Sequence, residues 1–358
     1  SIVSLRGNVR MTDKRSKVDR VTYVPLQLAP SFALPKRRWI LSPGLSLVRL
    51  MGPLKRELDS EMSRVIPRPN VRANYTIEVC STEYDRHIRR NLVESGKAVP
   101  STPEGFDPVG FDAPSSAQMV LTAMLLQRDI RFAIGGAYGF ALLPDGRRDP
   151  HDTYLDMRLL DSMPGQWRRY HPNRSKGPLD RKLLSQTIGR LEPYYRPITW
   201  EIDRLAVALK HFWEAFTTER YHQNFISLTV LLEALLTTRD IEVTHLIAER
   251  AACLVGGNGA DRVQTYRDVR RIYADRSKIV HGRSVPKRGP IDLKNVLVIS
   301  PKMNLLPDDV HRKLVCLSVK LLNALLVNEE YLEIVRSGNS EDTINKNLDE
   351  FFIKMLLK

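Results

Sequence analysis

An arginine and a histidine near the end of one predicted helix are the residues of this chain best suited to chemistry on a phosphate. Arg276 and His281 are five residues apart, and Gly282 follows directly. Glycine is favoured just after a helix, so His281 is expected at the helix C-terminus. That end of a helix favours a cationic side chain, which suits an imidazolium acting as a general acid. A guanidinium can hold two oxygens of one phosphate.

The helix that carries both residues has an apolar seam that Arg276 interrupts. The seam residues are spaced three and four apart: Tyr266, Val269, Tyr273, Arg276 and Val280. A guanidinium on an apolar stripe is costly unless it is paired or faces a cleft or an interface. One interpretation is an ion pair with an acid of a neighbouring helix, for which Glu233 is the obvious partner.

The spacing of Arg276 and His281 limits how they act together. Five residues of ideal helix separate the two side chains by about 140°. One straight helix therefore cannot aim both at one phosphate. Either the last turn unwinds, or two copies of the helix pair across a two-fold axis and share a site. The other cations fall elsewhere around the helix and are expected to be solvated: Arg267, Arg270, Arg271 and Lys278.

The elements that must position these residues form an all-α helical bundle over residues 179–358. Apolar residues recur at helical spacing through this half, with short loops between the segments. The predicted helices are 202–216, 225–236, 243–255, 262–280, 310–335 and 341–357.

Residues 1–178 are predicted to form a separate basic α+β domain that senses a trigger or binds nucleic acid. Alternating or β-rich segments indicate strands at 21–28, 39–50, 74–80 and 130–143. Helical spacing marks 54–65, 84–93 and 116–127. The polar, proline-bearing segment 162–178 is the predicted boundary. The predicted fold class is thus an α+β domain followed by an all-α bundle.

The positive charge of the chain is concentrated in its first half. The net charge is +14, and residues 1–198 contain 32 Lys and Arg against 20 Asp and Glu. Residues 199–358 contain 23 against 21. Such a bias favours contact with a polyanion, although a plain soluble basic surface explains it as well. Segment 166–176 interleaves aromatic residues with cations, as single-strand binding surfaces do and as a long basic loop also does.

Several other classes of protein find no support in the sequence. The apolar runs are far shorter than the roughly 18 residues of a membrane span, and the first residues lack the apolar stretch of a secretory signal. Three widely spaced cysteines indicate reduced thiols, so a cytoplasmic location is expected. The histidines lack metal-ligand spacing, and no cofactor or metal is predicted. Three aspartates near His151 are more simply explained by a polar loop than by a cation site: Asp149, Asp152 and Asp156.

Three blocks in the second half resemble the HEPN superfamily, and most closely its ApeA-like group. The blocks are Leu231–Leu236 (LLEALL), Ala248–Gly256 (AERAACLVG) and Ile272–Gly282 (IYADRSKIVHG). They occur in this order, and the R-x4-H pattern closes a helix before a glycine. The resemblance covers roughly residues 199–335 and is strongest over 225–282.

The resemblance implies a dimeric, metal-independent endoribonuclease that acts as a toxin or antiviral effector. Arg276 and His281 fall on the family's R-x4-6-H motif and would be the catalytic pair. Ser277 stands where active members often carry Asn, Asp or His. Glu233 and Arg250 match recurrent polar positions and are expected to support the site. The ribose 2′-OH would attack the phosphate, leaving a 2′,3′-cyclic phosphate and a 5′-hydroxyl.

The partners expected on this basis are RNA, a second copy of the chain and a regulatory or antitoxin-like protein, with no membrane. Cations around and after the motif are candidates for contact with the RNA backbone: Arg271, Lys278, Arg283, Lys287 and Arg288. A solvated loop explains the last three equally well. The alternative function is a non-catalytic HEPN module that dimerises and binds RNA, nucleotide or a partner protein, with Arg276 in a structural ion pair.

Overall fold

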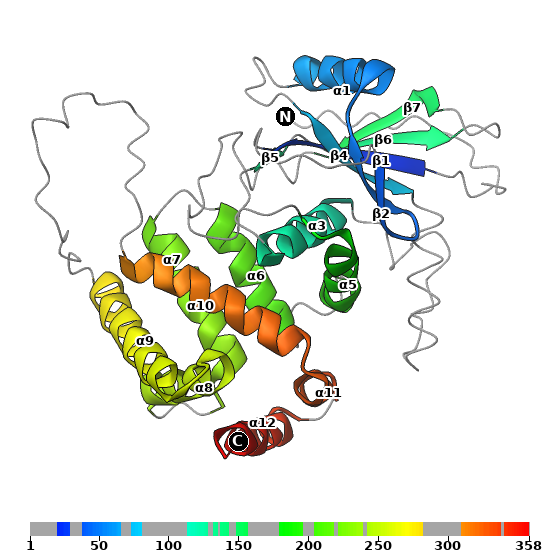
Figure 1. Cartoon of the computed structure of the whole chain (residues 1–358). Coiled ribbons are helices and arrows are strands. Elements are labelled where there is room, and N and C mark those ends of the chain that lie inside the picture. Colours follow the sequence, from blue (N-terminus) through cyan, green and yellow to red (C-terminus); the bar gives the residue numbers. More distant parts are fainter. Residues whose placement is uncertain are drawn as a thin grey trace, which may run out of the picture.

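The chain folds into an antiparallel sheet with flanking helices, followed by a helical bundle (Figure 1). The computed structural model describes residues 20–28, 38–65, 73–80, 113–127, 132–134, 137–142, 148–156, 179–195, 204–217, 221–238, 242–281, 309–337 and 340–357. The α+β region followed by helices confirms this coarse part of the predicted fold class.

The sheet is built from β1 to β7, in the order β2-β3-β4-β1-β6-β7, with β5 also paired to β1. Every pairing is antiparallel. The strands are β1 (Arg20–Leu28), β2 (Arg38–Ser42), β3 (Leu45–Arg49), β4 (Tyr75–Cys80), β5 (Phe132–Ile134), β6 (Ala137–Leu142) and β7 (Arg148–Asp156). The strand predicted over 39–50 is a hairpin of β2 and β3, which turns at Pro43 and Gly44, where Gly44 adopts a positive φ of 74°.

Alternation along β1 divides its side chains between two cores. Val21 and Tyr23 pack with Leu58 of α1 (Gly52–Val65) in a small cluster. Leu26 and Leu28, one register position out of phase, belong to the main core. α3 (Ala113–Gln127) and α5 (Arg181–Leu191) contact this second face of the sheet.

The helices of the second half match the predicted ones closely. They are α6 (Arg204–Thr217), α7 (Tyr221–Leu236), α8 (Val243–Val255), α9 (Gly259–Val280), α10 (Asp309–Leu326), α11 (Glu329–Arg336) and α12 (Glu341–Leu356), and a 3-10 turn, η1 (Glu192–Tyr194), follows α5. The single helix predicted over 310–335 is wrong, because α10 ends at Leu326. Asn328 caps α11 by accepting a hydrogen bond from the Tyr331 amide at 2.9 Å, so a new helix begins there.

One assignment in the first half is wrong. Asp149, Asp152 and Asp156 were assigned to a polar loop, but they lie on β7, which pairs with β6. α5 also covers the edge strand β2: Arg181 donates to the Ile40 carbonyl, and Ser185 donates to the Leu41 carbonyl. Side chains that occupy edge carbonyls protect the sheet from pairing with another chain.

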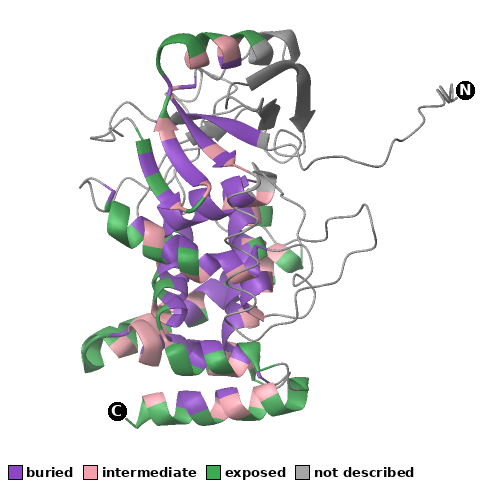
Figure 2. Ribbon diagram, turned by 90° about the vertical axis from the view of Figure 1, so that its right-hand side faces the viewer, coloured by how far each residue is buried: buried purple, intermediate pink, exposed green. Residues whose placement is uncertain are grey.

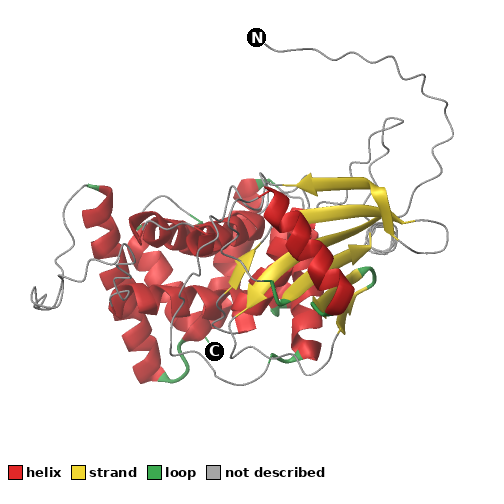
Figure 3. Ribbon diagram, turned by 90° about the horizontal axis from the view of Figure 1, so that it is seen from above, coloured by secondary structure: helices red, strands yellow, loops and turns green. Residues whose placement is uncertain are grey.

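The hydrophobic core continues from the sheet into the bundle. One cluster of buried residues includes Leu47 of β3, Leu121 of α3, Ile188 of α5 and Leu232 of α7. Figure 2 shows buried residues running without a break from the strands into the helices, and Figure 3 shows the helices gathered beside the sheet. Asn323 of α10 donates a 2.9 Å hydrogen bond to the Leu126 carbonyl at the end of α3. The domain boundary at residues 178/179 stays a prediction.

Some predicted features lie outside the described residues. These are the helix at 84–93, the basic aromatic segment 166–176 and the three cations Arg283, Lys287 and Arg288. Within the part of the chain that the structure describes, no helix is both long and apolar enough to cross a membrane.

Candidate active site at the end of helix α9

The helix that carries the predicted catalytic pair begins at a tight corner with α8. Asn258 caps α9 by accepting a 3.0 Å hydrogen bond from the Asp261 amide. Gly256 lies so close to Arg262 that a Cβ atom at this position would be 2.7 Å from the Arg262 Cα. Any larger residue would force α8 and α9 apart. The glycine therefore fixes the angle at which α9 leaves the corner and crosses α7.

The helix remains regular to its last residue. The His281 amide donates to the Ser277 carbonyl at 3.1 Å, which is a helical hydrogen bond. Of the two arrangements that the sequence left open, unwinding of the last turn is therefore not observed before His281. Because the helix is continuous, ideal geometry keeps the Arg276 and His281 side chains about 140° apart.

Arg276 forms an ion pair with Glu233 of α7. Its Nη2 lies 3.1 Å from Glu233 Oε1 and 3.2 Å from Oε2. The Arg276 side chain is 32% exposed and that of Glu233 24% exposed, so the pair sits at the rim of the bundle. Arg276 Nε is buried without a hydrogen-bond partner among the described residues. The ion pair that the seam predicted is present, and it uses one of the three guanidinium nitrogens.

Tyr273 completes this cluster. Its buried hydroxyl donates to the Thr229 carbonyl at 3.3 Å, and the Glu233 carboxylate lies close enough to influence its titration. The Arg276 guanidinium lies over the Tyr273 ring, 5.8 Å from its centroid. Burial raises the pKa of Tyr273 well above its ordinary value. The phenol is therefore a proton donor that stays neutral.

Burial also dominates the titration of Glu233. It raises the pKa of this carboxyl above its ordinary value of 4.5, although the positive charge of Arg276 and the hydrogen bond with Tyr273 act in the opposite direction. Glu233 thus accepts a proton more readily than a free glutamate.

The remaining candidates on α9 divide between exposed and engaged residues. His281 and Ser277 are exposed, whereas Arg271 is half-buried. Lys278 donates to the buried Asp275 at 2.6 Å, so its charge is largely balanced within the helix. His281 and Ser277 lie on a face of α9 that turns away from the Arg276–Glu233 pair.

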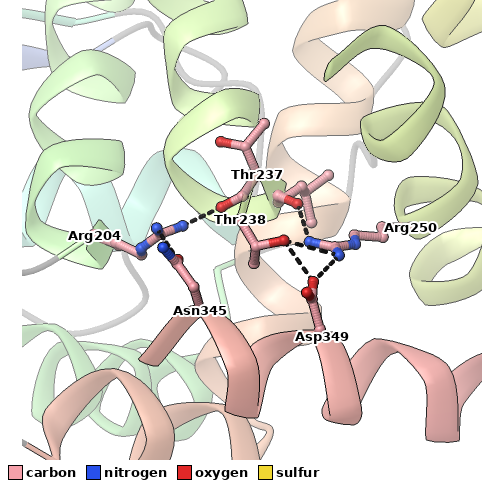
Figure 4. A network of polar contacts seen from close by, with 7 residues as sticks. Arg204, Thr237, Thr238, Arg250, Asn345 and Asp349 are labelled. Atoms are coloured by element: carbon pink, nitrogen blue, oxygen red, sulfur yellow. Dashed lines mark hydrogen bonds and ion pairs between the residues drawn. The ribbon is translucent and has the colours of Figure 1, made fainter. Parts of the chain in front are cut away.

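Arg250, predicted as a supporting residue, does not contact Arg276 but fastens the C-terminal helix (Figure 4). From α8 it donates to the Leu236 carbonyl at 2.6 Å, to Thr238 Oγ1 at 3.1 Å and to the Asp349 carboxylate of α12. Its guanidinium also lies 4.5 Å from the centroid of the Phe352 ring. Arg250 is therefore a buried structural clamp.

A second arginine repeats this arrangement one helical turn earlier along α12. Arg204 of α6 donates to the Thr237 carbonyl and to Asn345 Oδ1 (Figure 4). Asn345 and Asp349 are four residues apart, so they share one face of α12. The two arginines thus link the segment at the end of α7, about one turn beyond Glu233, to α12. Each donates to a backbone carbonyl of that segment and to a side chain of α12. No pattern in the sequence indicates this contact, because it joins residues far apart in the chain.

Nothing in this part of the molecule indicates a metal centre. Among the described residues, no group of three or more His, Cys, Asp or Glu side chains is arranged to hold a metal ion. Comparison of the chain with protein-family models, with curated proteins and with solved structures found no match. Its assignment therefore depends on the residues described above.

Proposed function

We propose that this chain is a metal-independent, HEPN-type endoribonuclease with Arg276 and His281 as its catalytic residues. We further propose that it acts in the cytoplasm as a toxin or antiviral effector. The observation that carries the proposal is the combination on one helix of an exposed imidazole at its end and a guanidinium held at the bundle rim by a partly exposed carboxylate. An imidazolium can protonate the leaving oxygen and a guanidinium can stabilise the phosphate charge, which are two of the roles that metal-free RNA cleavage needs.

In the proposed reaction the ribose 2′-oxygen attacks the adjacent phosphorus as its proton leaves, and the bond to the 5′-oxygen breaks. The imidazolium of His281 gives its proton to the leaving 5′-oxygen, which departs as a 5′-hydroxyl, and the proton of the 2′-hydroxyl passes to a solvent water. The other product is a 2′,3′-cyclic phosphate. Arg276 stabilises the negative charge that builds on the phosphate oxygens, with nitrogens that Glu233 leaves available. Each role contributes a few powers of ten in rate.

The proposed active form is a homodimer. A continuous helix separates Arg276 from His281 by about 140°, so one copy cannot direct both at the same phosphate. A two-fold axis near the end of α9 would bring Arg276 of one protomer toward the partner's His281. A regulatory or antitoxin-like protein would hold this site inactive until a trigger arrives, so the purified chain without that partner is expected to cut RNA.

The chemistry of the product ends tests this proposal. Cleaved RNA should carry a cyclic phosphate at one new end and a hydroxyl at the other. An RNA with a 2′-O-methyl group at the cleaved nucleotide should remain intact, because its 2′-oxygen cannot attack. Ends with a 5′-phosphate, or cleavage of the methylated RNA, would show that water attacks instead and that the proposed mechanism is wrong.

One observation favours the alternative function, a non-catalytic HEPN-like module that dimerises and binds RNA, nucleotide or a partner protein. Arg276 is fully accounted for as a structural residue if its contacts with Glu233 and Tyr273 only join α9 to α7. In that case Arg276→Ala should lower the thermal stability, whereas His281→Ala should change neither stability nor any biological effect of the protein.

A further inference from the structure

Helix α9 segregates its acidic and basic side chains onto different faces. Asp261, Asp268 and Asp275 are seven residues apart and therefore lie on one stripe. Two of them are neutralised: Asp268 accepts from Lys313 of α10 at 2.9 Å, and Asp275 accepts from Lys278 at 2.6 Å. Asp268 and Asp275 thus face the bundle or its border, whereas Asp261 is exposed in the first turn.

The opposite face of α9 is exposed and carries cations without acids. Arg267 and Arg270 are exposed on this face, and the half-buried Arg271 lies at its border with the stripe of aspartates. Within the described residues, none of these three arginines forms an ion pair. Arg267, Ala274 and His281 are seven residues apart, so the arginines share a continuous face with the histidine that closes the helix.

We propose that this α9 face, defined by Arg267, Arg270, Arg271, Ser277 and His281, binds the sugar–phosphate backbone of single-stranded RNA and leads it to His281. The identity of the polyanion as RNA rests on the proposed function, whereas its binding to this face does not require cleavage. The face is about 21 Å long from Arg267 to His281, at 1.5 Å per helical residue. It spans several nucleotides.

The composition of the α9 face favours a backbone contact over base recognition. The two tyrosines of the helix are engaged elsewhere: Tyr266 is hydrogen-bonded to His245 at 2.9 Å, and Tyr273 is buried. Base stacking needs an aromatic platform, and the described residues of this face include no Phe, Tyr or Trp. Arginine contacts to phosphates carry no sequence information, so we expect binding to be independent of sequence.

The positive charges of Arg267, Arg270 and Arg271 argue against a second copy of the chain packing on this part of the α9 face. A two-fold axis there would place the arginines of one protomer against those of its partner, and like charges facing each other are unfavourable. This inference also revises the expectation that Arg267 and Arg270 are merely solvated. Lys278 is expected to contribute less to RNA binding than these arginines, because Asp275 already balances its charge.

Binding of a fluorescent oligouridine, measured by anisotropy at several salt concentrations, tests the proposal. The protein carries His281→Ala so that the probe stays intact. Log affinity falls as log salt rises, and each single-strand phosphate contact contributes about 0.7 to the magnitude of this slope. Replacing Arg267, Arg270 and Arg271 together by glutamine should therefore reduce the magnitude of the slope by about 2. A matched control replaces three exposed lysines on other helices by glutamine: Lys182, Lys210 and Lys320. The control should keep the slope.

Several outcomes would overturn the inference. One is that the His281→Ala protein does not bind oligouridine at all, and another is that the arginine and lysine triple variants lose equal amounts of salt dependence. A third is that duplex DNA or a poly-glutamate peptide binds the same face more tightly than oligouridine does. If the triple variant does not fold by circular dichroism, Arg270→Gln alone should lower the slope by about 0.7. Arginine-dependent binding in a protein that never cleaves RNA would support the α9 face and refute the proposed nuclease.

Discussion

Arg276 Nη2 lies 3.1 Å from Glu233 Oε1, and this contact joins α9 to α7 across 43 residues of sequence. Both side chains retain part of their exposure, so solvent screens the attraction and its net contribution is modest, about 1 kcal/mol or less. A contact of this strength positions the guanidinium and yet can be exchanged for a phosphate. The same pair is thus compatible with either a structural or a catalytic arginine, and variants must separate the two.

The first prediction concerns His281. Replacing it by alanine should lower the rate of RNA cleavage by about 10²–10⁴-fold, the usual contribution of a general acid or base. The melting temperature should not change, because the side chain is exposed and its backbone hydrogen bond is kept. His222→Ala, on the exposed side of α7, is the control and should retain the wild-type rate. An equal loss of cleavage rate in the His281→Ala and His222→Ala variants would show that His281 has no specific catalytic role.

A second prediction tests whether the site is shared between protomers. Arg276→Ala and His281→Ala proteins should each be inactive, but a mixed dimer contains one intact arginine and one intact histidine on different chains. If the site forms across the two-fold axis, mixing equal amounts should restore about a quarter of the wild-type activity, because half of the dimers are mixed and each has one working site. A mixture that stays inactive after subunit exchange, verified by mass spectrometry, would place both residues in one protomer.

The raised pKa of Glu233 predicts how stability depends on pH. Because the folded state binds this proton more tightly than the unfolded state, the free energy of unfolding should decrease as pH rises from about 4.5 through the folded-state pKa. Glu233→Gln lacks this titration. Urea unfolding of both proteins between pH 4 and 8 should therefore show the wild-type stability falling relative to that of the variant. A difference that rises with pH would mean that Arg276, and not burial, dominates the carboxyl.

The contact of Arg250 with Asp349 of α12 should contribute far more to the free energy of unfolding than the Arg276–Glu233 ion pair. Asp349→Ala leaves the buried Arg250 guanidinium without its carboxylate, which should destabilise the protein by about 3 kcal/mol. Lys354→Ala removes an exposed cation from the same helix, paired only with Glu330 at the surface, and should leave the melting temperature unchanged. A thermal melt of each variant checks this. Similar melting temperatures would show that Arg250 and Asp349 do not fasten α12.

The sequence predicted the bundle well because each helix has apolar residues at helical spacing and ends at a recognisable signal. α8 was predicted with its observed bounds, Val243–Val255, since Gly256 and Gly257 follow it. The break at Asn328 was missed because apolar spacing continues through it, although Asn is a good N-cap. β7 was missed because its polar residues resemble a loop, and only pairing with β6 makes it a strand.

The candidate site shows the same division between local and long-range information. The ion pair of Arg276 with Glu233 was predictable, because a cation on an apolar stripe needs an acid. The exposure of His281 on another face followed from helical geometry. Tyr273 was read only as a seam residue, and its hydroxyl reaches Glu233 because α7 and α9 cross there. The link from Arg250 to Asp349 joins residues 99 apart, and no local pattern encodes it.

The most direct test of the central claim is to incubate the purified protein with end-labelled RNA and with DNA of the same sequence in excess EDTA. We predict that the RNA is cut, that the DNA survives because it lacks the 2′-hydroxyl, and that His281→Ala abolishes the cleavage. Cleavage that requires a divalent ion, that extends to the DNA, or that persists in His281→Ala at the wild-type rate would contradict the claim.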